Sequence, residues 1–309
     1  AGFVSCRACG HVIKCPHCDV SLSLHRGGRM VCHYCGYQRP AEKKCPSCGS
    51  SYIGAFRAGT QQVTELVQKE FPGVRVLRMD FDTTKQKGGH EQILEAFSRG
   101  EADVLVGTQM IVKGHDFPGV TLVGILAADL SLYAGDFHAS ERTFQLLTQA
   151  AGRAGRGDES GIAVIQTYSP DHYSVKAAAA QDYKSFFEQE MAYRRLMNYP
   201  PAAHLLALYM MSGQEAALEE GAELIRSLTF EAVRRLQKHE GKGADIQVIG
   251  PAEAGLAKLK DVYRKVLYLK CGELSVLLAW KESMEAEFGR EEKLRALNIQ
   301  FDMDPVNPF

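Results

Sequence analysis

The chain has 309 residues, 45% of them hydrophobic and 24% charged, which is the composition of an ordinary soluble globular protein with room for two or three domains. Its formal net charge of −1 excludes a global basic field, so any contact with nucleic acid must come from a local patch. No run of about eighteen apolar residues occurs, so no membrane span is indicated. The first residues, Ala1 to Cys6, contain neither a Met nor the basic-then-apolar pattern of a signal peptide, and we expect the chain to be part of a longer protein.

Eight of the nine cysteines lie in the first 48 residues as four Cys-x-x-Cys pairs. Two thiolates three residues apart on a tight turn can both reach one Zn²⁺ at about 2.3 Å. A disulfide framework is the alternative, but it requires an oxidising compartment, which no signal peptide supports. The spacing therefore predicts two structural zinc sites in a module that covers residues 1–50.

A predicted hairpin indicates which pairs share an ion. Residues 20–31 have the pattern of an alternating strand, a Gly27-Gly28 turn and a short return strand. Because a hairpin brings its own ends together, the two cysteine pairs that flank it are expected to share one ion. The ligands of this inner site are Cys15, Cys18, Cys32 and Cys35. The ligands of the outer site are then Cys6, Cys9, Cys45 and Cys48.

Strands and helices alternate over residues 51–170. The first predicted strand ends near Phe56, and the others cover 74–79, 102–106, 122–126 and 162–167. The predicted helices cover 60–71, 90–99 and 144–151. Such alternation requires parallel crossovers, so we predict an α/β doubly wound domain with a parallel sheet. Ligands of such sheets bind outside the carboxyl ends of the strands.

The loop 107–118, Gly-Thr-Gln-Met-Ile-Val-Lys-Gly-His-Asp-Phe-Pro, follows one of these strands. The Thr108 hydroxyl and the nearby backbone N–H groups suit a phosphate, and Lys113 and His115 add charge or donors. Asp116 is placed to orient an arginine or a ribose hydroxyl. An ordinary turn is the alternative for each of these features taken alone.

The segment 149–156, Gln-Ala-Ala-Gly-Arg-Ala-Gly-Arg, lies between a helical run and a buried strand. Its two guanidinium groups, Arg153 and Arg156, are permanently charged and suit bidentate contact with phosphate. Solvated loop arginines are the alternative. Together, the two segments predict a phosphate-binding site at the edge of the sheet.

These two segments resemble motifs V and VI of superfamily 2 helicases. With the four cysteine pairs and the stretches Phe71–Val74 and Asp80–Thr84, the chain closely resembles the PriA family of bacterial primosomal replication-restart helicases, over nearly its whole length. The resemblance implies that residues 51–170 form the second RecA-like lobe of an ATP-dependent 3′-to-5′ DNA helicase. It also implies that the first motor lobe is not contained in these residues.

The resemblance implies roles for single residues. Arg153 and Arg156 match the motif VI arginines that reach the γ-phosphate of the nucleotide, and Gln149 matches that motif's coordinating glutamine. We also expect Asp116 and Gly152 to lie beside the nucleotide. The residues expected at the DNA backbone are Gly59, Thr60, Gly107, Thr108, Lys113 and His115.

Half of an ATP site has no counterpart in the sequence. No Gly-x-x-x-x-Gly-Lys-Ser/Thr occurs, and the only Gly-Lys pair, Gly241-Lys242, is followed by Gly243. No Asp-Glu-x-His run follows a buried strand. We therefore expect ATP and Mg²⁺ to bind only in the full-length protein, and this chain to have no ATPase activity alone.

Residues 171–201 are predicted to form a helical connector that ends at Asn198-Tyr-Pro-Pro201. Residues 202–309 then predict the order βαββαβ of a split ferredoxin-like α+β domain, with strands at 205–211, 247–250, 264–270 and 298–303 and helices at 215–239 and 274–288. Between its middle strands lie Lys258, Lys260 and Arg264 beside Tyr263, a pattern that suits single-stranded DNA, with a solvated hairpin as the alternative.

The expected function follows from the resemblance. The full protein would recognise stalled or recombined replication forks and restart replication by assembling the primosome. Its expected partners are forked or single-stranded DNA, the single-stranded DNA-binding protein and other primosome proteins, with no membrane, and it would act as a monomer at the nucleoid of the bacterial cytoplasm. Two alternatives remain open: another superfamily 2 translocase of the RecG type, and a non-enzymatic zinc-ribbon adaptor for nucleic acid.

Overall fold

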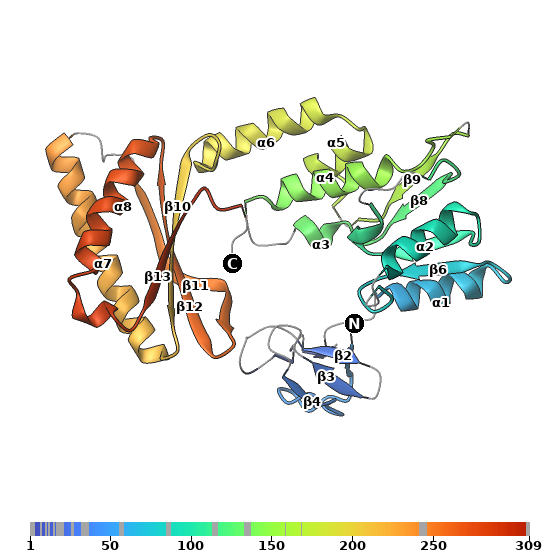
Figure 1. Ribbon diagram of the computed structural model, residues 1–309, viewed down its shortest axis with the longest axis horizontal. Coiled ribbons are helices and arrows are strands. Elements are labelled where there is room, and N and C mark those ends of the chain that lie inside the picture. The colour runs from blue at the N-terminus through green and yellow to red at the C-terminus, as the bar shows by residue number, and fades with distance from the viewer. Residues whose placement is uncertain are drawn as a thin grey trace. The chain divides into compact units, whose positions relative to one another are not determined.

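Figure 1 shows the computed structural model of the chain. It describes residues 4–6, 8–9, 11, 13–14, 16, 22–25, 28–31, 37–55, 59–84, 88–112, 117–132, 137–157, 159–167, 169–240 and 246–306. The chain divides into two compact units, Phe56–Glu190 and a second unit that joins Phe3–Ala55 with Met191–Phe309. Among the described residues, no helix combines the length and the apolar character that crossing a bilayer demands.

The first unit is an α/β domain built on parallel strand pairs. Strand β6 (Val76–Met79) pairs in parallel with β7 (Val104–Gly107), and β8 (Leu122–Ile125) pairs in parallel with β9 (Ile162–Ile165). The predicted parallel α/β lobe is thereby confirmed, although the strand end expected at Phe56 lies outside the described residues. The helices of this unit are α1 (Thr60–Glu70), α2 (Gly89–Ser98), α3 (Asp129–Leu132), α4 (Ala139–Ala151) and α5 (Tyr173–Ala179), with a short 3-10 turn, η1 (Gln109–Val112).

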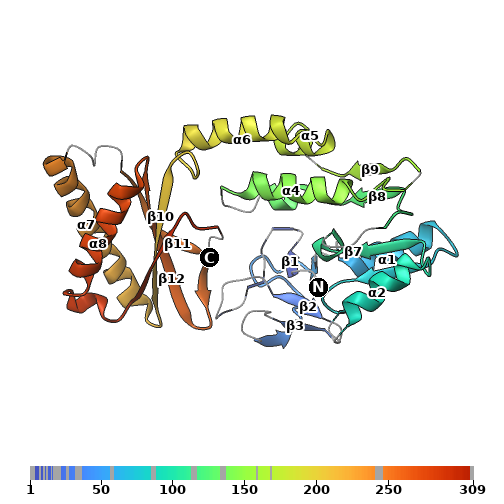
Figure 2. The same ribbon diagram turned by 45° about the horizontal axis from the view of Figure 1, so that its top comes forward.

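The apolar face of α4 fixes the position of the loop that follows it. Phe144 and Leu147 are buried with Val175 and Phe186, and the Phe144 and Phe186 rings stack with their centroids 4.1 Å apart. Figure 2 shows α4 running beside β8 and β9. The helix ends at Ala151, so the Gly-Arg segment begins where a packed helix stops.

Helix α6 (Tyr183–Met197) lies within residues 171–201, for which the sequence predicts a helical connector. The Tyr173 hydroxyl of α5 donates a hydrogen bond of 2.6 Å to the buried carboxylate of Glu190. After Met197, Asn198 takes a left-handed conformation with φ 52°, which ends the helix at the expected place. The helix therefore has a defined end at Met197.

The cysteine-rich segment is built from short antiparallel strands. Strand β1 (Val4–Cys6) pairs with β5 (Ile53–Ala55), and β3 (Arg29–Val31) pairs with both β2 (Ser23–His25) and β4 (Gln38–Pro40). The β2–β3 pair confirms the hairpin that the sequence predicts. Leu22 and Met30 are fully buried between these strands.

The C-terminal domain confirms the predicted order βαββαβ. Its four strands form one antiparallel sheet in the order β11-β12-β10-β13: β10 (His204–Ser212), β11 (Gln247–Leu259), β12 (Val262–Cys271) and β13 (Asn298–Met303). Helices α7 (Glu215–Glu240) and α8 (Leu274–Phe288) cover one face of the sheet (Figure 1), and the short turn η2 (Glu292–Leu294) precedes β13. Trp280 and Met284 are fully buried against Leu208 and Met210.

Strand β11 runs further than the sequence predicts, to Leu259 instead of Gly250. Its pairing with β12 is interrupted between Ile249 and Ala252, where Pro251 has no N–H to donate. The strand resumes after this irregularity and turns at Lys260 and Asp261, whose φ angles of 50° and 62° are those of a two-residue hairpin turn. The predicted basic residues therefore lie on a long hairpin.

Candidate metal, nucleotide and nucleic-acid sites

The outer cysteine set gathers as predicted. The sulfur atoms of Cys6, Cys9, Cys45 and Cys48 all lie within 4.8 Å of one another. The Sγ atoms of Cys6 and Cys48 are 3.7 Å apart, and those of Cys9 and Cys45 are also 3.7 Å apart. A tetrahedron of sulfurs at about 2.3 Å from a central Zn²⁺ has edges of about 3.8 Å, so the geometry fits this metal. The inner set, Cys15, Cys18, Cys32 and Cys35, lies outside the described residues.

Backbone turns hold the outer set. The Cys6 N–H donates to the His11 carbonyl at 2.8 Å, and the Cys45 N–H donates to the Ser50 carbonyl at 2.8 Å. Gly49 follows the last cysteine with φ 72°, a conformation that glycine adopts without strain. Each Cys-x-x-Cys pair is thus bent around the sulfurs by the turn that carries it.

The pKa values of two of the outer thiols are shifted in opposite directions. Burial raises the pKa of Cys6, but the backbone N–H groups of Cys9 and Ala8 and the Cys48 thiol outweigh it and lower that pKa to about 7. For Cys48, the backbone N–H of Ser50 lowers the pKa, but the neighbouring thiols and burial outweigh it and raise it to about 12. Thiols packed this closely cannot all ionise by themselves, and a bound cation would remove that conflict.

The two predicted phosphate-binding loops lie against each other. The Arg153 guanidinium donates a short hydrogen bond to the Val112 carbonyl, at the end of η1. The Gly155 N–H donates to the Val120 carbonyl at 2.9 Å. A Cβ atom on Gly157 would lie 2.5 Å from the Pro118 carbonyl oxygen, so only glycine allows this approach. The loop after β7 and the loop after α4 are therefore one packed assembly.

The remaining residues of these loops are distributed as follows. Gln149 and Arg156 are exposed, and the Arg156 Nε atom donates to the Gly152 carbonyl at 2.7 Å. Thr108 is exposed, whereas a Cβ atom on Gly107 would collide with Ile111 and with the Met79 carbonyl. Lys113, His115 and Asp116 lie outside the described residues.

The Gly59-Thr60 turn carries a partner that sequence reasoning missed. Gly59 precedes α1 in an extended conformation and offers no side-chain cap, and the Thr60 hydroxyl donates to the Asp80 carboxylate at 2.5 Å. Burial raises the pKa of Asp80, but the hydrogen bonds from Thr60 and Thr83 and the Arg78 charge outweigh it and lower that pKa. The available signal was the Asp-Phe-Asp-Thr-Thr stretch directly after a strand.

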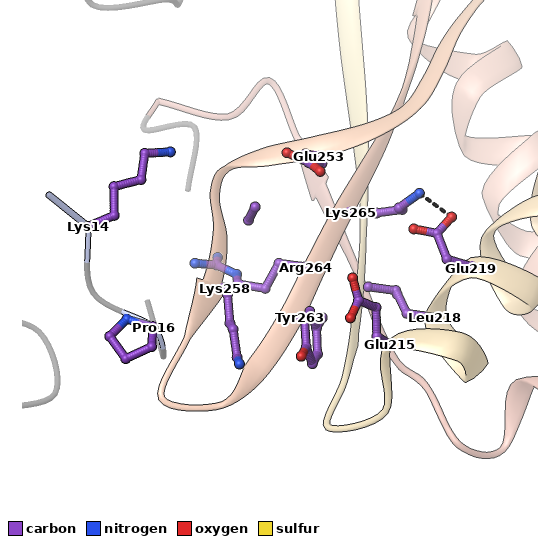
Figure 3. A pocket seen from close by; sticks show the side chains of 11 residues that line it. Lys14, Pro16, Glu215, Leu218, Glu219, Glu253, Lys258, Tyr263, Arg264 and Lys265 are labelled. Atoms are coloured by element: carbon purple, nitrogen blue, oxygen red, sulfur yellow. Dashed lines mark hydrogen bonds and ion pairs between the residues drawn. The ribbon is translucent and has the colours of Figure 1, made fainter. Parts of the chain in front are cut away.

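Three basic residues of the β11–β12 hairpin, Lys258, Arg264 and Lys265, line a pocket of about 440 Å³ in the second unit (Figure 3). The Lys258 Nζ atom lies 4.6 Å from the centroid of the Tyr263 ring, and Lys265 forms an ion pair of 2.5 Å with Glu219 of α7. Arg264 is only 7% exposed, whereas Lys260 is exposed at the turn. The pocket is lined by four basic residues, Lys14, Lys258, Arg264 and Lys265, and by three acidic ones, Glu215, Glu219 and Glu253. Its charges are nearly balanced, so it is not a strongly cationic groove.

Three protein-family descriptions match the chain in order. Residues 15–40 match the PriA DNA helicase Cys-rich region (CRR) domain, residues 52–158 match the helicase conserved C-terminal domain, and residues 195–306 match the primosomal protein N C-terminal domain. The parallel α/β lobe, its adjoining motif loops and these matches define the C-terminal part of a superfamily 2 helicase.

The similar proteins narrow this class to one family. A replication restart protein PriA from Bacillus subtilis is 45% identical over 306 residues, which cover 99% of this chain and 37% of that protein. PriA proteins from Synechocystis and Treponema pallidum are 43% and 38% identical, over 87% and 98% of this chain. The chain belongs to the PriA family of replication restart helicases. It spans 37%, 32% and 44% of the lengths of these three relatives.

Proposed function

We propose that this chain is the C-terminal part of an ATP-dependent 3′-to-5′ DNA helicase that recognises stalled or recombined forks and restarts replication. The observation that carries the proposal is the contact of Arg153 with the Val112 carbonyl. A helicase must convert the state of a nucleotide into movement along DNA. A loop that faces the nucleotide, packed directly on a loop that faces the strand, supplies a short route for that coupling.

The proposed nucleotide site is a half-site. Gln149, Arg153 and Arg156, with Asp116 and Gly152, face the γ-phosphate of an ATP–Mg²⁺ complex whose phosphate cradle and magnesium ligands come from the remainder of the full-length protein. Arg156 is exposed and held by its own helix end, so its guanidinium is available in a defined orientation. An arginine in this role stabilises transition-state charge and contributes about 10³–10⁵ in rate.

The test is DNA-stimulated ATPase activity of the full-length protein. Arg156→Ala and Arg153→Ala are each expected to abolish nearly all turnover, because each removes a positive charge that faces the γ-phosphate in the proposed site. Arg99→Ala is the matched control, since Arg99 is an exposed arginine of the same unit whose guanidinium pairs with Glu95 and Glu101. Turnover that survives both motif substitutions would refute the arginine roles. Measurable ATPase activity of the 309-residue chain alone would refute the half-site.

The proposed DNA contacts are made chiefly through the phosphate backbone. In the first unit they are Gly59, Thr60, Gly107, Thr108, Lys113 and His115, and on the hairpin they are Lys258, Lys260 and Arg264. Because Lys258 lies over one face of the Tyr263 ring and Lys265 is already paired, we assign the hairpin a secondary role. Binding of this chain to single-stranded DNA is expected to be weak and to fall steeply as salt rises. Affinity that does not change with salt would contradict phosphate contact.

Two structural Zn²⁺ ions complete the proposal, one in each cysteine set. The further partners we propose are the single-stranded DNA-binding protein and other primosome proteins, which the full-length protein would meet as a monomer at the bacterial nucleoid. The zinc-ribbon adaptor remains distinguishable by experiment. An adaptor would bind forked DNA in the full-length protein without any DNA-stimulated ATPase activity.

A further inference from the structure

Asp80 is a fixed negative charge beside the Gly59-Thr60 turn. Its Oδ2 atom accepts the Thr60 hydroxyl at 2.5 Å and lies 3.1 Å from the Arg78 Nε atom. Its Oδ1 atom accepts the backbone N–H groups of Asp82 and Thr83, each at 3.0 Å. Only 15% of the Asp80 side chain is exposed. The carboxylate is therefore held from several sides and does not behave as a mobile surface group.

This charge stands where the proposed function requires a DNA phosphate. A threonine hydroxyl has one proton to donate, and Asp80 accepts it. A phosphate at the same turn would need that proton, and it would also lie within a few ångströms of the carboxylate. Competition for the donor and repulsion between like charges both act against the phosphate. Arg78 offsets part of the Asp80 charge, so the opposition is moderate.

We propose that Asp80 is a positioning residue that restrains DNA binding at the Gly59-Thr60 turn. It holds the Thr60 hydroxyl while no strand is bound and gives it up when a phosphate docks. The inference rests on the proposed DNA contact at Thr60. Its functional value is reversibility, because a motor that steps along a strand must let go of each phosphate as readily as it takes the next. Asp80 supplies an internal ligand that replaces the departing phosphate.

The test measures binding of the 309-residue chain to a fluorescently labelled oligothymidylate by anisotropy. Asp80→Asn keeps the shape of the side chain and an acceptor for the two backbone N–H groups but removes the charge. It is expected to tighten binding about threefold to tenfold at low salt, and the gain should shrink as salt rises because the repulsion is screened. Asp103→Asn removes one carboxylate charge from the same unit and serves as the control, with an expected change below about twofold.

A second substitution separates this inference from the function on which it rests. Thr60→Val removes the donor and keeps the shape, so it should weaken binding. In that background Asp80→Asn should give a smaller gain, because only the relief of charge repulsion remains. If Thr60→Val binds as tightly as the unaltered chain, the contact at Thr60 and the inference both fail. If Thr60→Val weakens binding but Asp80→Asn does not tighten it, the inference alone fails. An equal gain from Asp103→Asn also overturns it.

Arg78→Gln covers the case in which Asp80→Asn lowers the temperature of thermal unfolding. Loss of Arg78 leaves the Asp80 charge without its cation, so Arg78→Gln should weaken binding more than Arg75→Gln does. Arg75 is the matched control because it directly precedes the same strand and pairs with Asp103 instead. Equal losses from the two arginine substitutions would overturn the inference.

Discussion

Arg75 and Asp103 form a two-point ion pair that joins the starts of β6 and β7. The Arg75 Nη2 atom lies 2.6 Å from Asp103 Oδ1, the Nε atom lies 3.1 Å from Oδ2, and the Arg75 backbone N–H donates to Oδ2 at 2.9 Å. In return, the backbone N–H groups of Asp103 and Val104 donate to the Arg75 carbonyl. The pair sets the register of two parallel strands whose opposite ends lead into the Asp80 turn and the Gly107 loop.

This ion pair predicts how stability depends on pH. The Arg75 hydrogen bonds lower the pKa of Asp103 to about 2, below the value of about 3.9 for an unfolded chain. Because the folded-state pKa is the lower one, the stabilisation is present above about pH 4 and is lost as pH falls towards 2. Urea unfolding followed between pH 5 and 2 should show a shallower loss of stability for Asp103→Asn than for the unaltered chain.

Both partners are about half exposed, so the expected effect is modest. Arg75→Gln should flatten the same part of the pH profile, whereas Arg99→Gln removes another surface arginine of the unit and should leave it in place. A profile of Asp103→Asn that coincides with that of the unaltered chain would contradict the assignment.

Gly155→Ala is expected to detach the Gly-Arg loop from the loop before it. Gly155 has φ 72°, and a Cβ atom there would lie 2.5 Å from the Gly161 nitrogen. The strained backbone and the clash should together cost about 1–3 kcal/mol of the free energy of unfolding. In the full-length protein, ATPase activity should fall because Arg153 and Arg156 flank the displaced residue.

Gly119→Ala is the matched control for this loop. A Cβ atom on Gly119 meets no atom within 4 Å, so this substitution should change both stability and ATPase activity little. Chemical denaturation and the ATPase assay measure the two quantities separately. Equal effects of the two alanine substitutions would show that the close approach at Gly155 is not needed.

Leu277→Ala is expected to destabilise the C-terminal domain by about 2–5 kcal/mol, because the side chain is fully buried against the sheet. Leu278→Ala, one residue further along α8, removes a side chain that is 42% exposed and should cost less than about 1 kcal/mol. The chain has a single tryptophan, Trp280, which is buried in the same core, so its fluorescence reports the unfolding of this domain. Similar losses for both variants would contradict the packing.

Local sequence patterns predicted the elements whose signals are local. The helix at 274–288 and the strand at 298–303 occur at the predicted bounds, because Gly272 and Gly289 flank the helix and apolar residues alternate along the strand. The continuation of β11 beyond Gly250 was missed, since Pro251 resembles a strand end when the partner strand is not known. The hydrophobic periodicity of a segment predicts the type of that helix or strand, but it does not identify the strands that pair with it.

The sequence identified the residues of the candidate site but not the atoms that these residues contact. Motif resemblance placed Arg153 and Thr60 in polar loops, but their partners, the Val112 carbonyl and Asp80, lie 41 and 20 residues away in the chain. Such pairings depend on how strands align in three dimensions, which spacing does not encode. The outer cysteine set was predictable because the hairpin assigns the two inner pairs to one ion and leaves the two outer pairs for the other.

The proposed nesting of the two zinc sites can be tested by substitution, beyond a count of bound metal. Cys6 and Cys45 belong to two pairs that are far apart in the sequence, yet their sulfurs lie in one cluster. In the nested arrangement, the double substitution Cys6→Ser with Cys45→Ser damages one site only, so metal analysis of the purified chain should fall from two zinc ions to one. If neighbouring pairs shared ions instead, the same double substitution would damage both sites and remove both ions. Cys271→Ser, which alters a buried thiol of the C-terminal domain, should retain two ions and controls for the loss of a cysteine. Adding Cys32→Ser to the double variant should remove the remaining ion and unfold the segment, because a module this small has too little core to fold without its metal.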